Sequence, residues 1–360
     1  MNKKRVLVAM SGGVDSSVAA AILKQDGYEV IGATMKIWPK EYCGKQHKKA
    51  CCSLNDIEDA QKVCSKLGIK HYVLNFEKVF REEVIDYFAS EYISGRTPNP
   101  CIICNERVKF GKLLEKAKEL DCDFVATGHY ARIERNGNGS CKLRQGLDES
   151  KDQSYVLFSL KKEQIAKSLF PIGGFKKSRV RETAKEFGLK LHEKPDSQEI
   201  CFIPEGNYSN FLKESCNVKP KKGDVLDSDG KKLGTHNGFW NFTIGQRKGL
   251  GISSSKPLYI IKIDPEKNII VVGESSQVNK KKFLVKGLNW LCKEGGREIE
   301  RDVKIRYVHQ KAKAKIKRIA DDTVEVEFLK GQEAITPGQA AVFYDGDIVI
   351  GGGWIEKVLG

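Results

Sequence analysis

Cysteines are the residues of this 360-residue sequence with the most reactive chemistry, and there are 11 of them. An odd number in a chain of this length argues against a disulfide framework and favours thiol chemistry or metal binding. Cys101 and Cys104 have Cys-x-x-Cys spacing, and Cys201 lies far beyond them in the sequence. A thiolate is both a strong nucleophile and a metal ligand, so these clustered cysteines are candidates for either kind of chemistry. No role is assigned to Cys43, Cys51 or Cys52.

A second chemical feature is the loop Ser11-Gly12-Gly13-Val14-Asp15-Ser16-Ser17, which follows the apolar run Val6–Met10 and opens a helical pattern. Glycines let a backbone approach phosphate, and the N–H groups at a helix N-terminus favour an anion. The loop lacks the Lys-Ser/Thr ending of a Walker A loop and the Gly-x-Gly-x-x-Gly pattern, which disfavours GTPases and dinucleotide enzymes. Asp15 is a candidate for orienting the loop or binding a metal. The alternative, a turn that merely caps a helix, is disfavoured by the strand and helix that flank it.

These groups need a scaffold, and the first two hundred residues predict an α/β one. Apolar runs alternate with amphipathic segments, which is typical of a parallel, doubly wound sheet. After about Pro204 the pattern changes to short β-rich runs separated by turns, including a hairpin connection at Asp264–Asn268. We predict three domains, 1–205, 206–280 and 281–360, the last of them a β-barrel. The expected strands are Val6–Met10, Val30–Ile37, His71–Phe76 and Phe124–Thr127, and the expected helices are Ser16–Gln25, Asp56–Leu67, Val79–Ser94 and Lys109–Leu120.

The net charge and the hydropathy of the chain limit the kinds of partner that it can bind. Lys and Arg number 62 against 47 Asp and Glu, a net charge of +15, and the excess is spread over all three predicted domains. That distribution fits a long polyanion lying across several domains, although a generally basic surface fits equally well. No apolar run approaches the ~20 residues of a membrane span, and the N-terminus does not have the pattern of a signal peptide. We therefore expect a cytoplasmic protein that is not bound to a membrane.

Longer motifs carry a family resemblance. Ser11–Ser16 resembles the PP-loop of ATP pyrophosphatases, which cleave ATP between the α- and β-phosphates. Further stretches resemble the bacterial tRNA-specific 2-thiouridylase (MnmA) family and extend over nearly the whole chain: Thr97–Asn105, Ala126–Arg132, Lys151–Leu157, Asp196–Ile203 and Gly245–Gly251. The resemblance implies a Rossmann-like sheet of the adenine nucleotide alpha hydrolase type.

The same resemblance implies an activity, ATP-dependent 2-thiolation of the wobble uridine of tRNA. The uridine C2 oxygen would be adenylated with release of pyrophosphate, and a cysteine persulfide would then deliver sulfur with loss of AMP. Mg²⁺ would accompany ATP. The implied partners are tRNA and a sulfur-donor protein, either a cysteine desulfurase or a sulfur-relay protein.

Matching positions give the implied site residues. Cys201 would carry the persulfide and Cys104 would be the second, nucleophilic cysteine, the two ending as a disulfide that must be reduced. ATP would be held by Ala9, Met10, Ser11, Gly12, Gly13, Val14, Asp15, Ser16, Met35 and Gly128. The target base would meet Asn99, Pro100 and Cys101, and the rest of the tRNA would contact His129, Lys151, Asp152, Gln153, Arg306, Tyr307 and Gln339.

Cys101 leaves a second sulfur route open, since some family members have Asp at this position. With Cys104 and Cys201 it offers three thiolates, and three thiolates can hold a [4Fe–4S] cluster with an open iron. We favour the persulfide route. Two other functions also stay open: a different PP-loop adenylase, for which neither Cys104 nor Cys201 would be needed, and a non-catalytic RNA-binding protein that has kept the loop.

Overall fold

The structure, a computed structural model, describes residues 3–37, 54–137, 139–194, 200–203, 207–293 and 295–359. Cys43, Cys51, Cys52 and the first part of the Asp196–Ile203 motif lie outside these ranges. The chain forms two compact units. Unit 1 consists of Met1–Ile85, Pro100–Gly206 and Asp347–Val349, and unit 2 of Asp86–Asn99, Asn207–Gly346 and Ile350–Gly360. Unit 2 therefore includes both β-rich regions, and the predicted boundary between them stays a prediction.

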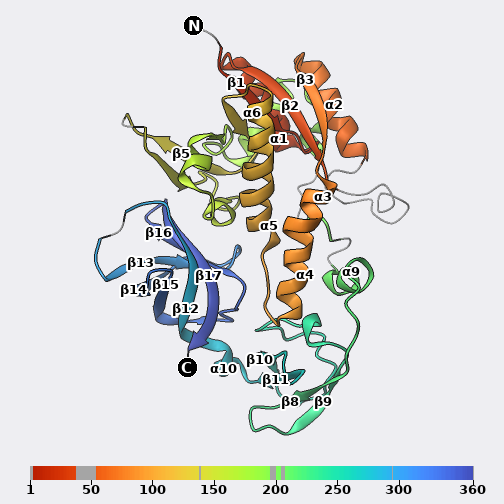
Figure 1. The fold of residues 1–360 in the computed structure, drawn as a ribbon, viewed down its shortest axis with the longest axis vertical. Helices are drawn as coiled ribbons and strands as arrows, with labels where there is room; N and C mark the ends of the chain where they lie inside the picture. Colours follow the sequence, from red (N-terminus) through yellow and green to blue (C-terminus); the bar gives the residue numbers. More distant parts are fainter. Residues whose placement is uncertain are drawn as a thin grey trace. The chain divides into compact units, whose positions relative to one another are not determined.

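A five-stranded parallel sheet forms the centre of unit 1 (Figure 1), as the sequence predicts. Every neighbouring pair in it is parallel. Val6, Leu7 and Val8 of β1 are fully buried because helices cover both faces of such a sheet. The strand order is β3-β2-β1-β4-β7, with β1 Arg5–Ala9, β2 Glu29–Lys36, β3 Lys70–Asn75, β4 Phe124–Ala126 and β7 Ser168–Leu169.

Helices α1 (Val14–Gln25), α2 (Leu54–Leu67) and α8 (Lys177–Glu186) pack beside this sheet. α1 is rich in small apolar residues, so it can lie close to the strands, and eight of its residues are buried. Its Val18 and Ala19 share a core with Val6 and Val8 of β1. The smaller elements of unit 1 are the antiparallel pair β5 Ala131–Arg135 and β6 Cys141–Gln145, α7 Lys162–Ala166, and the 3-10 helices η4 Ser154–Leu157 and η5 Lys190–Glu193.

Two helical stretches differ from the prediction. The predicted helix Val79–Ser94 is divided into α3 (Glu77–Phe80), the π-helix η2 (Arg81–Ile85) and α4 (Asp86–Ile93). The predicted helix Lys109–Leu120 begins nine residues earlier, at Pro100. It runs through three consecutive elements: α5 Pro100–Ile103, the π-helix η3 Cys104–Lys112 and α6 Leu113–Glu119. Proline is well suited to the first helical position because its missing N–H has no partner there.

The first part of unit 2 is a four-stranded sheet in the order β10-β11-β8-β9. β10 and β11 pair antiparallel across Asp264–Asn268, so the predicted hairpin is confirmed. Asn268 adopts a left-handed φ of 54°, which asparagine tolerates in turns. The bounds are β8 Gly223–Leu226, β9 Lys232–His236, β10 Tyr259–Asp264 and β11 Ile269–Gly273, with helices α9 Tyr208–Ser215, η7 Phe239–Asn241 and α10 Ser275–Val278.

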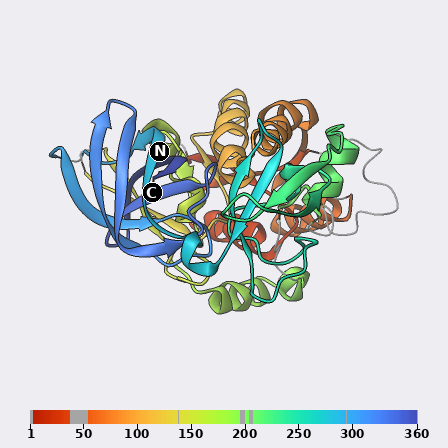
Figure 2. The same cartoon turned by 90° about the horizontal axis from the view of Figure 1, so that it is seen from below.

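A closed six-stranded antiparallel barrel is the second β-rich part of unit 2, which confirms the predicted β-barrel; its strands curve around a common interior in Figure 2. The barrel is closed because β12 pairs with both β15 and β17. Alternate residues point inward, and Phe283 and Phe328 meet there with ring centroids 5.6 Å apart. The strands are β12 Asn279–Trp290, β13 Glu298–Lys304, β14 Ala312–Ala320, β15 Thr323–Glu333, β16 Ala340–Asp345 and β17 Ile348–Leu359.

Candidate nucleotide and thiol site

The predicted phosphate loop lies between the end of β1 at Ala9 and the start of α1 at Val14. Gly12 has a left-handed φ of +69°, and a Cβ there would lie 2.3 Å from the Asp56 carbonyl oxygen, so glycine is required. The Ser16 and Ser17 hydroxyls both donate to the Gly13 carbonyl, at 3.2 and 2.8 Å. Gly13 is the N-cap of α1 and has no side chain to satisfy the first helical N–H groups. Those N–H groups suit a phosphate.

Gly128 and Met35 lie at the same edge of the sheet as the loop. A Cβ on Gly128, just after β4, would lie 2.7 Å from both the Asp15 carbonyl carbon and the Ser16 nitrogen. Met35 follows Ala33, the residue of β2 that pairs with Ala9, by two positions, so it lies beyond the end of β1. Ligands of open α/β sheets bind at this carboxyl edge. The structure thus brings the predicted nucleotide residues to one place.

Asp15 is held by two residues to which the sequence analysis assigned no role at this loop. Tyr130 Oη donates to Asp15 Oδ1 at 2.8 Å, and Lys177 Nζ contacts both carboxylate oxygens at 2.8 Å. The Lys177 side chain is only 12% exposed, so water screens this ion pair weakly. Lys177 lies in the first turn of α8, 162 residues from Asp15, and no spacing in the sequence signals their contact. Asp15 is therefore fixed in place and its charge is balanced.

A second lysine reaches the loop from the other side. Lys194 Nζ donates to the Gly12 carbonyl at 2.9 Å and contacts Asp56 Oδ1 at 2.7 Å and Asp59 Oδ2 at 2.8 Å. Both aspartates lie in the first half of α2. Like Lys177, Lys194 was missed because its partners are more than a hundred residues away in sequence.

His129 is buried, with its ring beside Phe110 and Phe170. Its Nδ1 lies 2.6 Å from the Thr127 hydroxyl. Burial, aided by the nearby Lys109, holds the pKa of His129 well below its usual value. The imidazole is therefore neutral at pH 7. It shares a hydrogen bond with the Thr127 hydroxyl and offers no positive charge to RNA.

The predicted tRNA-contacting stretch Lys151–Gln153 contains two side chains that bond to other parts of the protein and one that carries a positive charge. Asp152 is 4% exposed and accepts hydrogen bonds from the Gly146 and Ser154 backbone N–H groups, the Ser154 hydroxyl and the Gln145 amide. Gln153 Oε1 accepts from the Tyr130 N–H at 3.0 Å. These two side chains fix the loop beside Tyr130. Lys151, half-buried, is the member of the stretch that carries a positive charge.

The three candidate thiols all belong to unit 1. Cys101 is exposed in α5, while Cys104, the first residue of η3, and Cys201 are half-buried. Phe202, the neighbour of Cys201, packs edge-to-face on Phe80 of α3 with ring centroids 5.5 Å apart. α3 and η2 in turn contact η3. The fold therefore brings the segments of Cys104 and Cys201 to the same group of helices.

Across the part of the chain that the structure describes, no three His, Cys, Asp or Glu side chains gather as a metal site. This finding gives no support to the alternative of a [4Fe–4S] cluster held by Cys101, Cys104 and Cys201. The thiols of Cys64 and Cys122 differ from the three candidate thiols, because burial raises the pKa of each to about 11. Those thiols stay protonated and unreactive at neutral pH.

Unit 2 contains the remaining predicted tRNA residues. Gln339 Nε2 donates to the Thr97 carbonyl at 2.8 Å, and the Thr97 N–H donates to the Pro337 carbonyl at 2.9 Å. The Gln339 side chain thus fixes the irregular segment that leads to Asn99. One terminal nitrogen of Arg306 bonds Ile244, Ala334 and Thr336, and its neighbour Tyr307 is 39% exposed beneath the Lys304 ammonium.

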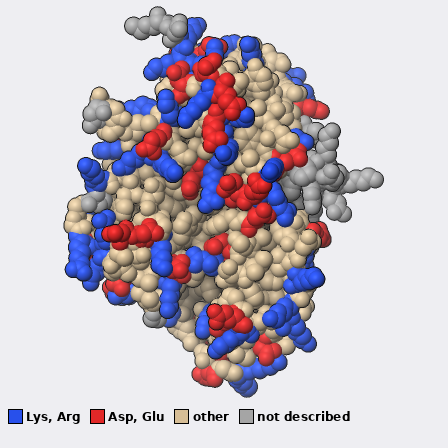
Figure 3. All heavy atoms as spheres, viewed as in Figure 1, with Lys and Arg blue, Asp and Glu red and all other residues tan. Residues whose placement is uncertain are grey.

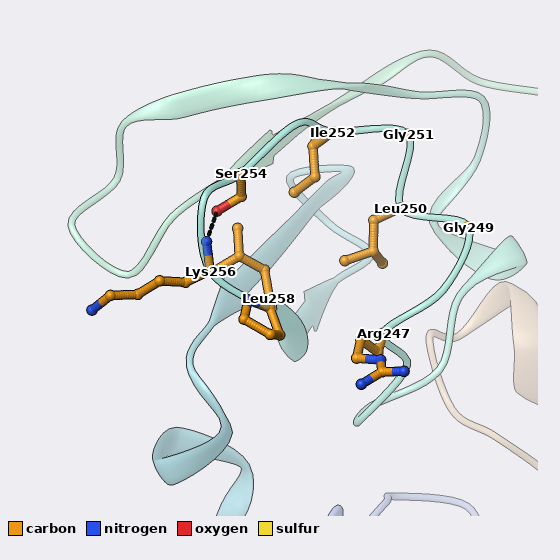
Figure 4. Close-up of a pocket in the computed structure, with 9 residues that line it drawn as sticks. Arg247, Gly249, Leu250, Gly251, Ile252, Ser254, Lys256 and Leu258 are labelled. Carbon is orange, nitrogen blue, oxygen red and sulfur yellow. Dashed lines mark hydrogen bonds between the residues drawn. The ribbon is translucent and has the colours of Figure 1, made fainter.

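Unit 2 also has a pocket of about 360 Å³ formed by the loop that begins with the Gly245–Gly251 motif. In Figure 4 the side chains of Leu250, Ile252 and Leu258 turn toward its hollow, Arg247 lies at its rim, and the Lys256 side chain extends away from it. The motifs assign no ligand to this pocket.

Comparison with known proteins places the whole chain. Residues 4–205 match the model described as the tRNA methyl transferase HUP domain, residues 209–274 the tRNA methyl transferase PRC-barrel domain, and residues 280–355 the aminomethyltransferase beta-barrel domain. Proteins named tRNA-specific 2-thiouridylase MnmA from Halothermothrix orenii and Clostridioides difficile are each 49% identical. The alignments cover 98% and 100% of this chain and 99% of each relative. The protein of that name from Geotalea uraniireducens is 47% identical over 99% of this chain and 96% of its own length.

Proposed function

The chain belongs to the family of tRNA-specific 2-thiouridylases named MnmA, and from this premise we propose that it replaces the C2 oxygen of the tRNA wobble uridine with sulfur, using ATP. The observation that carries the proposal is the content of unit 1. A phosphate-binding loop and the segments of two cysteines with half-buried side chains belong to one compact unit. Activation by ATP and delivery of sulfur can then occur on the same base.

The first step is adenylation. The loop from Ala9 to Ser16, with Gly128 against it, presents the α-phosphate of ATP to the uridine C2 oxygen. That oxygen attacks the phosphorus, pyrophosphate leaves, and the poor leaving group becomes AMP. Mg²⁺, which the family implies, suits this loop, since the ion takes most of its ligands from phosphates and water and needs one or two carboxylates. Asp15 would be the carboxylate that holds it, and Lys177 and Tyr130 orient Asp15.

The second step transfers sulfur. The terminal sulfur of a Cys201 persulfide attacks C2, a C–S bond forms, and AMP departs with the C–O bond electrons. The Cys104 thiolate then attacks Cys201 Sγ and cleaves the S–S bond, which releases 2-thiouridine and leaves a Cys104–Cys201 disulfide. An external thiol reductant restores both cysteines, and a cysteine desulfurase or a sulfur-relay protein reloads Cys201. The packing of Phe202 on Phe80 supports the pairing, because it anchors the Cys201 segment to helices that contact η3.

Recognition of tRNA involves both units. Gln339 supports Thr97 and thereby the Asn99–Cys101 segment that meets the target base. Lys151 offers a positive charge, while Asp152 and Gln153 hold its loop in shape. Arg306 and Tyr307 lie in the connection between β13 and β14, where Tyr307 presents an exposed ring to RNA.

Mass analysis of tRNA tests the proposal. Wobble-uridine tRNA is incubated with the protein, ATP, Mg²⁺ and a persulfide donor, and its nucleosides are then separated. We expect one sulfur in place of one oxygen at the wobble uridine, dependent on ATP and lost in Cys104→Ser and Cys201→Ser. Release of pyrophosphate with no sulfur in the tRNA, unchanged in both cysteine variants, would instead identify a different PP-loop adenylase.

A further inference from the structure

We propose that Asp148 is a positioning residue that joins the predicted tRNA-contacting stretch Lys151–Gln153 to the ATP-binding loop through Lys177, so that tRNA and ATP bind cooperatively. The inference rests on the function proposed above, because it concerns how the two substrates of that reaction are coupled. Every contact that carries it lies in unit 1 and joins described residues. The sequence motifs did not include Asp148.

Helix α8 obtains its N-terminal cap from another part of the chain. Its own N-cap residue, Lys176, makes no side-chain hydrogen bond to the first turn, since a lysine ammonium has no acceptor atom. The Lys177 backbone N–H donates instead to Asp148 Oδ2 at 2.9 Å, across 29 residues of sequence. A carboxylate at this place also interacts favourably with the positive end of the helix dipole. The position of Asp148 therefore helps to fix the first turn of α8.

Asp148 is bonded equally closely to the tRNA-contacting stretch. Its backbone carbonyl accepts from the Lys151 N–H at 3.0 Å. Its Oδ1 accepts from the backbone N–H and the hydroxyl of Ser150, at 3.1 and 2.6 Å. The hydrogen bond from Lys177, followed by that from the Ser150 hydroxyl, holds the pKa of Asp148 below its usual value, so the carboxylate is charged at pH 7. A tRNA phosphate bound by Lys151 would thus hold in place the same residue that caps α8.

The Lys177 side chain continues this connection to the ATP loop, because its Nζ contacts both Asp15 carboxylate oxygens at 2.8 Å. A single residue, Lys177, therefore separates Asp148 from Asp15. A second path reaches the same carboxylate. Gln153 bonds the Tyr130 backbone twice, its Oε1 accepting from the N–H at 3.0 Å and its own N–H donating to the carbonyl at 2.8 Å. Tyr130 Oη then donates to Asp15 Oδ1 at 2.8 Å, so both paths end on Asp15.

This arrangement predicts positive cooperativity between the two substrates. Asp15 lies in the first turn of α1, beside the phosphate loop, and Lys151 lies in the stretch predicted to contact tRNA. Each ligand fixes residues on which the site of the other depends, so each strengthens binding of the other. By thermodynamic linkage the factor is the same in both directions. The coupling favours the use of ATP by protein that already holds tRNA.

Binding of α,β-methylene-ATP to the full-length protein measures the coupling without turnover, because this analogue cannot be cleaved between its α- and β-phosphates. Its Kd is measured by calorimetry in the presence of Mg²⁺, with and without saturating tRNA. We expect tRNA to lower the wild-type Kd by about fivefold to fiftyfold, within the usual range of such couplings. In Asp148→Ala most of this effect is expected to be lost, while the Kd without tRNA stays close to the wild-type value.

Three variants separate positioning from general stability. Asp148→Asn keeps an oxygen that can accept the Lys177 N–H, so it is expected to retain most of the coupling. Ser150→Ala removes one bond to Asp148 but leaves the contact with Lys177, and it is expected to keep the coupling too. Asp227→Ala is the matched control, because Asp227 is also half-buried and its Oδ1 accepts two backbone N–H groups in a turn, but in unit 2. These variants and Asp148→Ala are compared by Tm.

A double variant tests the path through Lys177. Lys177→Met is expected to lose at least as much coupling as Asp148→Ala, and the two substitutions together are expected to lose no more than Lys177→Met alone, because both act on one path. A further loss in the double variant overturns the proposal. So does a wild-type Kd that does not respond to tRNA, full coupling in Asp148→Ala, or an equal loss in Asp227→Ala. Cooperative binding without formation of 2-thiouridine would instead contradict the proposed function and leave this coupling standing.

Discussion

At the scale of single residues, the aspartates around the nucleotide loop are paired with lysine and tyrosine donors before any ligand binds. Asp15 has Lys177 and Tyr130 as partners, and Asp56 and Asp59 share Lys194. These three carboxylates are thus held in place and paired with donors, which reduces their repulsion of a bound phosphate. The sequence motifs found the loop but predicted none of these contacts, although Tyr130 lies within one of the motifs.

Replacement of Lys177 tests this balance. Lys177→Met leaves Asp15 charged and half-buried beside the phosphate site, so we expect kcat/KM for ATP to fall by about tenfold or more, since breaking one side of a partly buried ion pair is costly. Lys176→Met is the matched control, because Lys176 is the exposed neighbour at the N-cap of α8. ATP-dependent pyrophosphate release measures both, and equal losses in the two variants would contradict the assigned role of Lys177.

The buried thiols give a pH-dependent prediction. The pKa of Cys64 and of Cys122 is raised to about 11, so the reactive thiolate form is scarce at pH 7 and increases only as the pH approaches 11. We expect iodoacetamide to leave both unmodified in the folded protein at pH 7.5 while Cys104 and Cys201 react. Peptide mass mapping checks this, and fast modification of Cys64 in native protein at that pH would show that the thiol is not buried as described.

At the scale of elements, the period of apolar residues correctly predicted the parallel sheet. β1, β2, β3 and β4 lie where their apolar runs predicted them. The prediction is clearest for a central strand such as β1, because burial on both faces demands a continuous apolar run, whereas β3 is a largely exposed edge strand. The helix that contains Cys104 was predicted too short. Its first nine residues lack helical periodicity, as the π-helix η3 changes which side chains share a face. Tyr130, Lys177 and Lys194 could not be predicted, because contacts across more than a hundred residues leave no local pattern.

The contact between β4 and the loop yields a sharp test. Gly128→Ala puts a methyl group 2.7 Å from backbone atoms of Asp15 and Ser16, so the loop must move, and we expect KM for ATP to rise about tenfold or more. Gly174→Ala is the control, since a Cβ there meets nothing within 4 Å. Steady-state kinetics of pyrophosphate release distinguishes them, and a Gly128→Ala enzyme with unaltered KM would show that the loop does not bind the nucleotide.

At the scale of the whole molecule, the net charge of +15 has no single location. Figure 3 shows Lys and Arg side chains interspersed with Asp and Glu over the face in view. Such a surface fits a large polyanion that contacts many points weakly. None of the described helices is long and apolar enough to span a membrane.

The polyanion interpretation predicts a steep salt dependence of tRNA binding. The logarithm of the association constant should fall linearly with the logarithm of salt concentration, and Lys151→Ala should reduce the slope by about one if it contacts one phosphate. Lys231→Ala is a suitable control, because Lys231 is an exposed lysine outside every predicted tRNA contact. Fluorescence titration measures both, and a flat salt dependence in wild type would contradict binding through phosphates.

The central claim is that one nucleotide loop and one pair of cysteines thiolate tRNA together, and a single-turnover experiment tests it most directly. Protein preloaded with persulfide at Cys201 is mixed with ATP, Mg²⁺ and excess tRNA in the absence of reductant. The account predicts equal amounts of 2-thiouridine, AMP, pyrophosphate and a Cys104–Cys201 disulfide, all quantified by mass spectrometry. Formation of 2-thiouridine with both cysteines still reduced, or without AMP, would contradict it.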